Sequence, residues 1–260
     1  MKKFLAIALA AVMLFALAAC GGNNTTDGNA TDGNATDGDA KAVLTMATNA
    51  EFPPYEYYQG DKVVGIDAEV AALIADKLGM ELQIVDIAFD SIIPGVQSGK
   101  YDMGMAGLTV TEDRLEKVYF STSYATGVQS VIVKADGAIQ SLDDITGKKI
   151  GVQTTTTGDI YATDDYGEEF VTRYDNGAAA VQALIAGKVD CVIIDNEPAK
   201  SYVAANEGLK ILDTSYTVED YAICFAKNNT ELKDKVDAAL KDLIADGSVQ
   251  AVVNKYIPAE

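Results

Sequence analysis

Histidine is absent from this sequence of 260 residues, and basic residues are scarce. Without histidine the chain can hold neither a Ser-His-Asp or Cys-His catalytic group nor a histidine-ligated metal ion. Its 20 lysines and arginines face 39 aspartates and glutamates, which gives a formal net charge of −19. A nucleic-acid-binding surface must neutralise phosphates, so this balance argues against nucleic acid as a partner.

The chain begins with a segment that is typical of export. Lys2 and Lys3 precede an uncharged, mostly apolar run over residues 4–17, and small residues then lead to Cys20. The run is short for a helix that spans a bilayer. The segment resembles a bacterial lipoprotein signal, with an ordinary secretory signal or a membrane helix as alternatives. We therefore expect residues 1–19 to be removed and Cys20 to carry the lipid (palmitate) that anchors the protein outside the cell membrane.

A low-complexity stretch follows the signal. The five-residue pattern that starts at Thr26 recurs at Thr31 and nearly again at Thr36. No residue in it can build a core, so residues 20–41 are predicted to be the lipidated cysteine and a disordered tether. Membrane contact is then expected only through the lipid.

The remaining residues show two successive runs of α/β alternation. Nearly half of the whole chain, 48%, is hydrophobic, which is enough for two modest domains. Short apolar strand patterns occur at 43–47, 82–84, 103–106, 149–153, 170–174 and 190–194, with helix patterns between them. Longer strand patterns at 128–134 and 221–226 would connect the two runs. This order predicts an α/β fold of two lobes, each a mainly parallel sheet flanked by helices, joined by two hinge strands. Lobe 1 would comprise 43–126 plus 222–260, and lobe 2 would comprise 127–221.

Arg114 lies in an unusual position for a cation. Thr111 is a good helix N-cap, and Arg114 follows within the first turn, where the helix dipole disfavours positive charge. Beside free backbone N–H groups, such an arginine is suited to clamp a carboxylate. The alternative is a surface arginine on a solvated helix face.

Other candidate residues lie at predicted strand ends. Two lobes joined by two strands imply a cleft, and ligands of open parallel sheets bind at the carboxyl ends of strands. The residues at such ends are Phe52, Tyr55, Phe89, Gly107, Thr109, Arg114, Thr156, Thr157 and Asp195.

The segment 106–114 resembles the central motif of the family 3 extracellular solute-binding proteins, the amino-acid-binding components of ABC importers. Segments 51–56, 65–70, 150–158 and 192–198 resemble further motifs of this family in the same order, so the resemblance covers 43–258. It implies a two-lobed periplasmic-binding-protein-like fold of type II. One departure is a run of four threonines at 154–157, where a glycine near position 155 is usual.

The resemblance also implies how the ligand's backbone is bound. Arg114 would bind the carboxylate, together with the N–H groups at 156–157 and the amide of Thr109. Asp195 would bind the ammonium, together with the Gly107 carbonyl and the Thr109 hydroxyl. No catalytic residue, metal or cofactor is expected.

The ligand's side chain is less clearly indicated. By similarity, Phe52 and Phe89 would flank it, with Tyr55 and Glu51 near its end. Glu51 beside the ammonium-binding aspartate could make the site acidic enough for a basic amino acid. Gln153, Tyr55 and the threonines suit a polar neutral side chain equally well.

Several of these residues also have a simple structural explanation. Phe89 could belong to the core, Asp195 could only cap the following helix, and 156–157 could be caps that never contact a ligand. Glu51 could be solvated. Cys191 and Cys224 fall in different predicted lobes, so we expect two buried free thiols.

The sequence thus predicts a monomeric, lipid-anchored receptor that binds an amino acid and delivers it to the permease subunits of an ABC importer. One alternative is a dehydratase-type enzyme on the same fold, with Glu51 or Asp195 as general acid. Another is a sensor domain; the chain ends at Glu260, just after its last predicted helix, which counts against a larger signalling protein.

Overall fold

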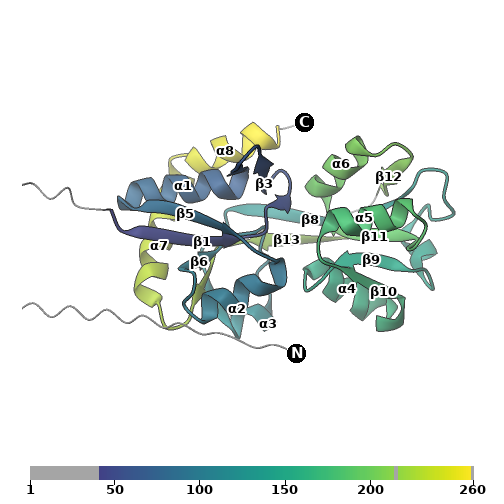
Figure 1. The fold of residues 1–260 in the computed structure, drawn as a ribbon, viewed down its shortest axis with the longest axis horizontal. Coiled ribbons are helices and arrows are strands. Elements are labelled where there is room, and N and C mark those ends of the chain that lie inside the picture. Colours follow the sequence, from purple (N-terminus) through teal and green to yellow (C-terminus); the bar gives the residue numbers. More distant parts are fainter. Residues whose placement is uncertain (1–40, 214–215, 259–260) are drawn as a thin grey trace, which may run out of the picture. The chain divides into compact units, whose positions relative to one another are not determined.

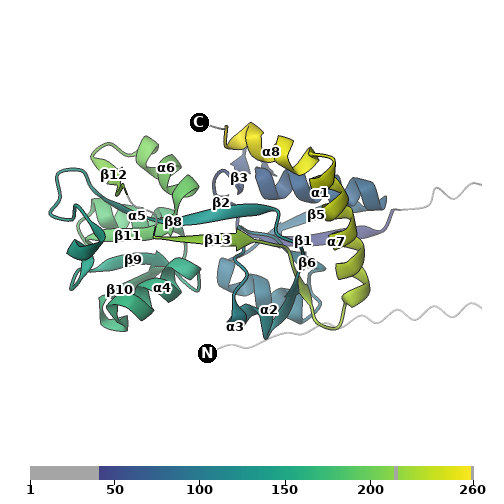
Figure 2. The same ribbon diagram turned by 180° about the vertical axis from the view of Figure 1, so that it is seen from behind.

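A computed structural model describes residues 41–213 and 216–258, which belong to one compact unit (Figures 1 and 2). The predicted signal peptide, the predicted lipidation site at Cys20 and nearly all of the predicted tether lie outside the described residues. Within these ranges, no helix has the length and apolar character needed to cross a membrane.

The first lobe is built on a five-stranded sheet with the order β5-β1-β6-β14-β7. Its strands are β1 (Val43–Thr48), β5 (Glu81–Asp86), β6 (Met103–Gly104), β7 (Val118–Phe120) and β14 (Cys224–Ala226). On one face lie α1 (Ile66–Leu78), α7 (Thr230–Ala245) and α8 (Ser248–Tyr256), and on the other lie the short helix η1 (Phe89–Ser91) and α2 (Ile92–Gln97) (Figure 1). Two apolar cores, one on each face, hold these layers together.

The second lobe is built on a six-stranded sheet with the order β10-β9-β11-β8-β12, in which β13 also pairs with β8. Its strands are β8 (Ala125–Lys134), β9 (Ile150–Gln153), β10 (Val171–Tyr174), β11 (Cys191–Asp195), β12 (Leu209–Ile211) and β13 (Thr217–Tyr221). The helix α4 (Thr157–Tyr166) packs on one face, whereas α5 (Gly177–Ile185) and α6 (Asn196–Ala205) pack on the other. Short helices η2 (Leu142–Ile145) and η3 (Glu168–Phe170) complete this lobe.

Two antiparallel strands run between the lobes. The first half of β8 pairs with β13, from Ala125 opposite Tyr221 to Gln129 opposite Thr217, and its second half pairs with β11 and β12. Figures 1 and 2 both show β8 and β13 side by side where one lobe gives way to the other. The predicted two-lobed α/β fold is therefore confirmed. Both sheets are mixed, because the connecting strands join parallel strands in antiparallel fashion.

Local capping signals explain many of the helix starts. Thr111 caps α3 (Glu112–Leu115), as predicted, and Asn176 caps α5, each accepting a backbone N–H bond through its side-chain oxygen. Ser141 and Asp144 form the capping box of η2. Asn229 caps α7, because its side-chain oxygen accepts from Leu232 N.

Strand predictions failed where the chain passes between layers. The single strand predicted over 221–226 is in fact two, β13 and β14, because the chain leaves one sheet and enters the other at 222–223. The strand predicted over 103–106 stops at Gly104. A small three-stranded sheet was not predicted: β2 (Glu51–Phe52), β3 (Glu56–Gln59) and β4 (Lys62–Val64). Strands this short carry too little periodicity to be recognised.

The two cysteines in the described residues are buried and free, as predicted. Cys191 lies in the sheet of the second lobe and Cys224 in that of the first. Burial raises the pKa of both thiols to about 12, so neither is a reactive thiolate near neutral pH.

A stability prediction follows from the first-lobe core. Phe225 of β14 is fully buried, so Phe225→Ala should lower the free energy of unfolding by about 3–5 kcal/mol through the cavity it leaves. Val218 of β13 is 66% exposed, so Val218→Ala should change it by less than about 0.5 kcal/mol. Urea unfolding followed by circular dichroism measures both, and similar values for the two variants would contradict the core assignment.

Candidate functional site

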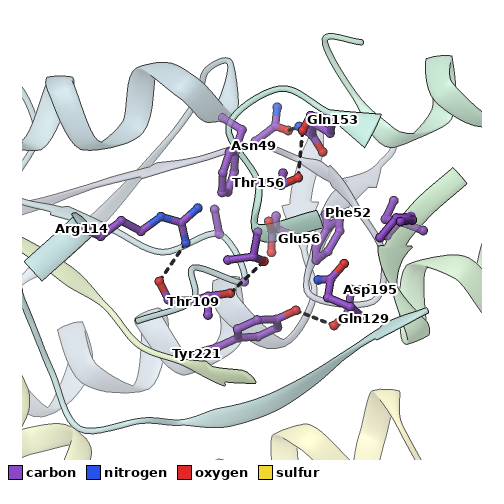
Figure 3. A pocket seen from close by; sticks show the side chains of 16 residues that line it. Asn49, Phe52, Glu56, Thr109, Arg114, Gln129, Gln153, Thr156, Asp195 and Tyr221 are labelled. Carbon is purple, nitrogen blue, oxygen red and sulfur yellow. Dashed lines mark hydrogen bonds between the residues drawn. The ribbon is translucent and has the colours of Figure 1, made fainter. Parts of the chain in front are cut away.

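A cavity lies between the two sheets, and both lobes contribute to its wall (Figure 3). Most of its lining residues end a strand or follow one. This is expected, because ligands of open α/β sheets bind at the carboxyl ends of the strands. The lining residues are Asn49, Phe52, Glu56, Phe89, Ala106, Gly107, Thr109, Arg114, Gln129, Gln153, Thr156, Thr157, Ile193, Ile194, Asp195 and Tyr221.

Arg114 brings a fixed positive charge to this cavity. The side chain is only 6% exposed, and its guanidinium lies 5.6 Å from the ring centre of Phe89. Nη1 donates to the Thr109 carbonyl at 2.8 Å, and Nη2 donates to the Thr155 carbonyl of the other lobe at 3.1 Å. Burial lowers the pKa of Arg114 and nearby Glu219 raises it, but a guanidinium stays charged in either case. Its remaining N–H donors are available to an anion.

The start of α4 adds backbone donors near the same place. Thr156 caps this helix by accepting from Asp159 N at 3.3 Å, and Thr157 is its first residue. The hydroxyls of Thr157 and Thr109 lie 3.5 Å apart across the cavity. A helix N-terminus with a charged arginine beside it favours a carboxylate.

The turn before α4 is conformationally strained. Thr155 has φ +62°, a left-handed conformation that β-branched residues rarely adopt. Asp159 holds it there, because its Oδ2 accepts from Thr155 N at 2.9 Å and from Arg173 Nε at 2.9 Å. This orientation directs the Thr155 carbonyl to Arg114.

Asp195 supplies a buried negative charge on the second-lobe side. It ends β11, is 1% exposed, and accepts from Glu197 N at 3.0 Å, from Val128 N at 3.1 Å and from the Tyr221 hydroxyl. Burial raises its pKa to about 7, although these hydrogen bonds oppose the shift. No salt bridge to Asp195 occurs in the part of the chain that the structure describes. Asp195 therefore both caps α6 and presents an unmatched carboxylate to the cavity.

Gly107 allows the backbone to pass close to the aromatic wall. Its φ is +51°, and a Cβ atom there would lie 3.0 Å from the Phe52 ring. Its N–H donates to Asp67 Oδ2 at 2.9 Å, which fixes the loop. Phe52 and Phe89 both line the cavity.

Comparison with known proteins agrees with this arrangement. Residues 44–259 match the family of bacterial extracellular solute-binding proteins, family 3. The chain belongs to this family. Among relatives, the arginine-binding extracellular protein ArtP of Bacillus subtilis (strain 168) is 33% identical over 267 residues that cover both chains completely. The L-cystine-binding protein TcyA of the same strain is 30% identical, covering 98% of this chain and 97% of TcyA.

Solved structures agree with the fold. An ancestral arginine-binding protein bound to glutamine superposes with a TM-score of 0.79 and 37% identity, covering 84% of this chain and 99% of that one. The arginine-, lysine-, histidine-binding protein ArtJ from Geobacillus stearothermophilus gives the same TM-score of 0.79 at 33% identity, covering 84% of this chain and 96% of its own.

Two of the predicted ligand residues in this solute-binding protein do not line the cavity. The Glu51 side chain is exposed, and its backbone carbonyl accepts from the Tyr202 hydroxyl at 2.9 Å. Tyr55 is 1% exposed and packs edge-on against Tyr221 in the first-lobe core. The other eight, Phe52, Phe89, Gly107, Thr109, Arg114, Thr156, Thr157 and Asp195, all line it.

Polar lining residues that the sequence did not single out include Asn49, Glu56, Gln129 and Tyr221. Asn49 Oδ1 accepts from Gln153 Nε2 of the other lobe at 2.9 Å, so this pair bridges the cavity. Gln129 could have been found from the sequence, because it is a polar residue that interrupts the apolar run of β8, and it is buried in the structure. No sequence pattern marks Glu56 or Tyr221 as a cavity residue, because only the fold turns their side chains inward.

The strained turn yields a prediction. Thr155→Gly should raise the free energy of unfolding by about 0.5–1 kcal/mol, because glycine adopts the left-handed conformation without steric cost. Thr154→Gly, at a neighbour without positive φ, should instead lower it by about 1 kcal/mol. Thermal unfolding without ligand measures both, and a loss of stability in Thr155→Gly would contradict the strain at this turn.

Proposed function

We propose that this protein is the extracytoplasmic substrate-binding component of an ABC importer, which captures a free amino acid with a basic or polar side chain. The proposal rests on a pair of buried, opposite charges. Arg114 lies beside the α4 N-terminus, and Asp195 has no salt-bridge partner among residues 41–213 and 216–258. An amino acid offers a carboxylate and an ammonium, which complement these two groups.

Each end of the ligand backbone has a proposed set of partners. Arg114, the N–H groups at 156–157 and the Thr109 amide bind the carboxylate. Asp195, the Gly107 carbonyl and the Thr109 hydroxyl bind the ammonium. Their shared position around one cavity supports these roles. Phe52 and Phe89, also in its wall, flank the side chain.

The relatives support the proposed ligand class. ArtP is named for arginine and TcyA for L-cystine, and ArtJ is named for arginine, lysine and histidine. The ancestral arginine-binding protein is bound to glutamine. Basic and polar amino acids therefore recur among proteins similar to this chain.

We infer that residues 43–126 with 222–260 and residues 127–221 move as two bodies about β8 and β13. Hydrogen bonds that already cross between them include Arg114 to the Thr155 carbonyl, Gln153 to Asn49, and Tyr202 to the Glu51 carbonyl. Each body holds only part of the cavity wall, so a ligand that contacts both favours the closed arrangement.

The proposed location of the protein and its proposed membrane partners are argued from the sequence alone. The signal that ends at Cys20 supports a lipid-anchored, monomeric receptor at the outer side of the bacterial cell membrane, which hands its ligand to permease subunits. Incorporation of labelled palmitate into the parent protein but not into Cys20→Ala would test the anchor.

An enzymatic role is the second candidate, since burial sets the pKa of Asp195 to about 7, within the range of a general acid. We propose that Asp195 binds an ammonium instead, because hydrogen bonds from 128, 197 and Tyr221 fix it. Turnover of a prephenate-type substrate that is lost in Asp195→Asn would favour the enzyme.

The first test is a thermal-shift screen of the refolded protein against the twenty amino acids. A ligand at 100 times its dissociation constant should add about 2.7 kcal/mol of stability.

Arg114→Ala should weaken binding by roughly 2–5 kcal/mol, because the bound carboxylate loses its buried partner. Lys117→Ala removes an exposed cation outside the cavity and should bind normally. Equal affinity of the parent and Arg114→Ala would exclude the clamp.

Binding should also depend on pH through Asp195. With its pKa at about 7 in the empty cavity, this group is partly protonated below pH 7 and must lose its proton to pair with an ammonium. Affinity should therefore fall as the pH drops from 7, by up to about tenfold per pH unit. In Asp195→Asn this contribution to the pH dependence should disappear, together with most of the affinity. Calorimetric titrations between pH 5.5 and 7.5 measure both effects.

A further inference from the structure

The cavity holds more acidic groups than a ligand's backbone can neutralise. A bound amino acid would pair its carboxylate with Arg114 and its ammonium with Asp195. Glu56 of β3 then remains: it lines the cavity, is 1% exposed, and its Oε2 has no hydrogen-bond partner among the described residues. Glu56 is the register partner of Phe52 on β2, so it belongs to the wall that faces the ligand's side chain (Figure 3).

Glu56 lies beside Asp67 of α1. Both side chains are fully buried, and Glu56 Oε2 and Asp67 Oδ1 have no hydrogen-bond partner among the described residues. Two carboxylates have only acceptor atoms, so a bond between them requires one proton. Asp67 already accepts from Gly107 N at 2.9 Å, which favours its charged form. A proton shared by the two carboxylates would therefore reside on Glu56.

The electrostatic surroundings of Glu56 agree with this assignment. Burial raises the pKa of Glu56 well above its usual value, and the neighbouring carboxyl groups raise it further. Burial also raises the pKa of Asp67, to about 6, against the hydrogen bonds that it accepts. The titratable groups that face Glu56 among the described residues are all acidic or phenolic: Tyr55, Asp67, Asp86, Tyr124, Asp195 and Tyr202. No salt bridge to Glu56 occurs between residues 41 and 258 where the structure is described.

A second buried acceptor faces the same cavity from the other lobe. Gln129 lines the cavity, and its Nε2 donates to Glu219 at 2.9 Å. Its Oε1 is buried and has no hydrogen-bond partner in the part of the chain that the structure describes. A buried acceptor without a donor costs about 1–3 kcal/mol. The cavity thus presents unmatched acceptors from β3 and from β8, and a ligand rich in N–H donors would satisfy both.

We propose that the ligand's side chain is cationic, and that on binding it replaces the proton shared by Glu56 and Asp67, which passes to the solvent. The inference rests on the proposed function, since it assumes that Arg114 and Asp195 hold the ligand's backbone. The exchange leaves the buried charge unchanged: the two carboxylates carry one negative charge with the proton, and one with a monovalent cation in its place. A guanidinium or ammonium also supplies the donors that Gln129 lacks.

The decisive experiment compares arginine with citrulline, its uncharged analogue, by calorimetric titration of the refolded parent protein at pH 7.5. Titrations in phosphate and in Tris, which differ in ionisation enthalpy, give the number of protons released. Any proton that Asp195 releases on binding is released with both ligands, because arginine and citrulline have the same amino-acid backbone. Arginine should bind at least about 30-fold more tightly and release up to about one proton more. Its advantage should grow by up to about tenfold from pH 7 to pH 8.

Variants locate the proton. Glu56→Gln keeps a donor to Asp67, because its amide can take the place of the carboxylic acid, but it cannot pair with a cation. It should lose about 30-fold in arginine affinity together with the extra proton release. Glu81→Gln removes an exposed carboxylate far along β5 from the cavity and should match the parent. Glu51→Gln tests the neighbouring exposed glutamate, which should not select the ligand.

Each contrary result has a distinct meaning. Equal affinity and equal proton release for arginine and citrulline would overturn the cation-for-proton exchange while leaving the amino-acid receptor intact. Loss of arginine selectivity in Glu51→Gln rather than Glu56→Gln would also overturn it. Absence of binding by every amino acid would instead contradict the proposed function. Should Glu56→Gln fail to fold, the measurement on the parent protein alone still decides the outcome.

Discussion

The structure depends on how a buried guanidinium is satisfied. Arg114 is held by two carbonyls, one from each lobe, and its guanidinium lies over the Phe89 ring. A buried cation without such partners would cost several kcal/mol. The bond to Thr155 therefore ties the position of the charge to the approach of the lobes. It also explains why a threonine is kept in a left-handed conformation, since only that turn directs its carbonyl to the arginine.

In contrast to Arg114, the acidic groups around the cavity are buried without partners that neutralise their charge within the described residues. Glu56 and Asp195 are buried without a cationic partner among the described residues, and each is raised in pKa by burial. Such groups lower stability in the empty protein but provide binding energy once a cation arrives. A receptor that must close on its ligand benefits from this arrangement, because the closed state is favoured only when the charges are matched.

Much of the fold was predictable from local patterns. Thr111 and Asn176 cap their helices through side-chain oxygens, as their residue types predict, and apolar runs at 43–47 and 190–194 are buried strands. These features depend on neighbours within a few residues. The break at 222–223 was not predictable in this way, because it arises where the chain exchanges hydrogen-bond partners in one sheet for partners in another.

The sequence by itself determined the family-like motif around Arg114, the aspartate at the end of a buried strand and the aromatic loop before the first helix. Only the tertiary structure decided which glutamate of that loop serves the cavity. Glu51 and Glu56 lie five positions apart in similar surroundings, and Glu56 lines the cavity, whereas the predicted Glu51 does not. The β2–β3 pairing places Glu56 opposite Phe52 and next to Asp67, while Glu51 faces solvent. That choice depends on strand register and on a helix more than ten residues away, which no local pattern specifies.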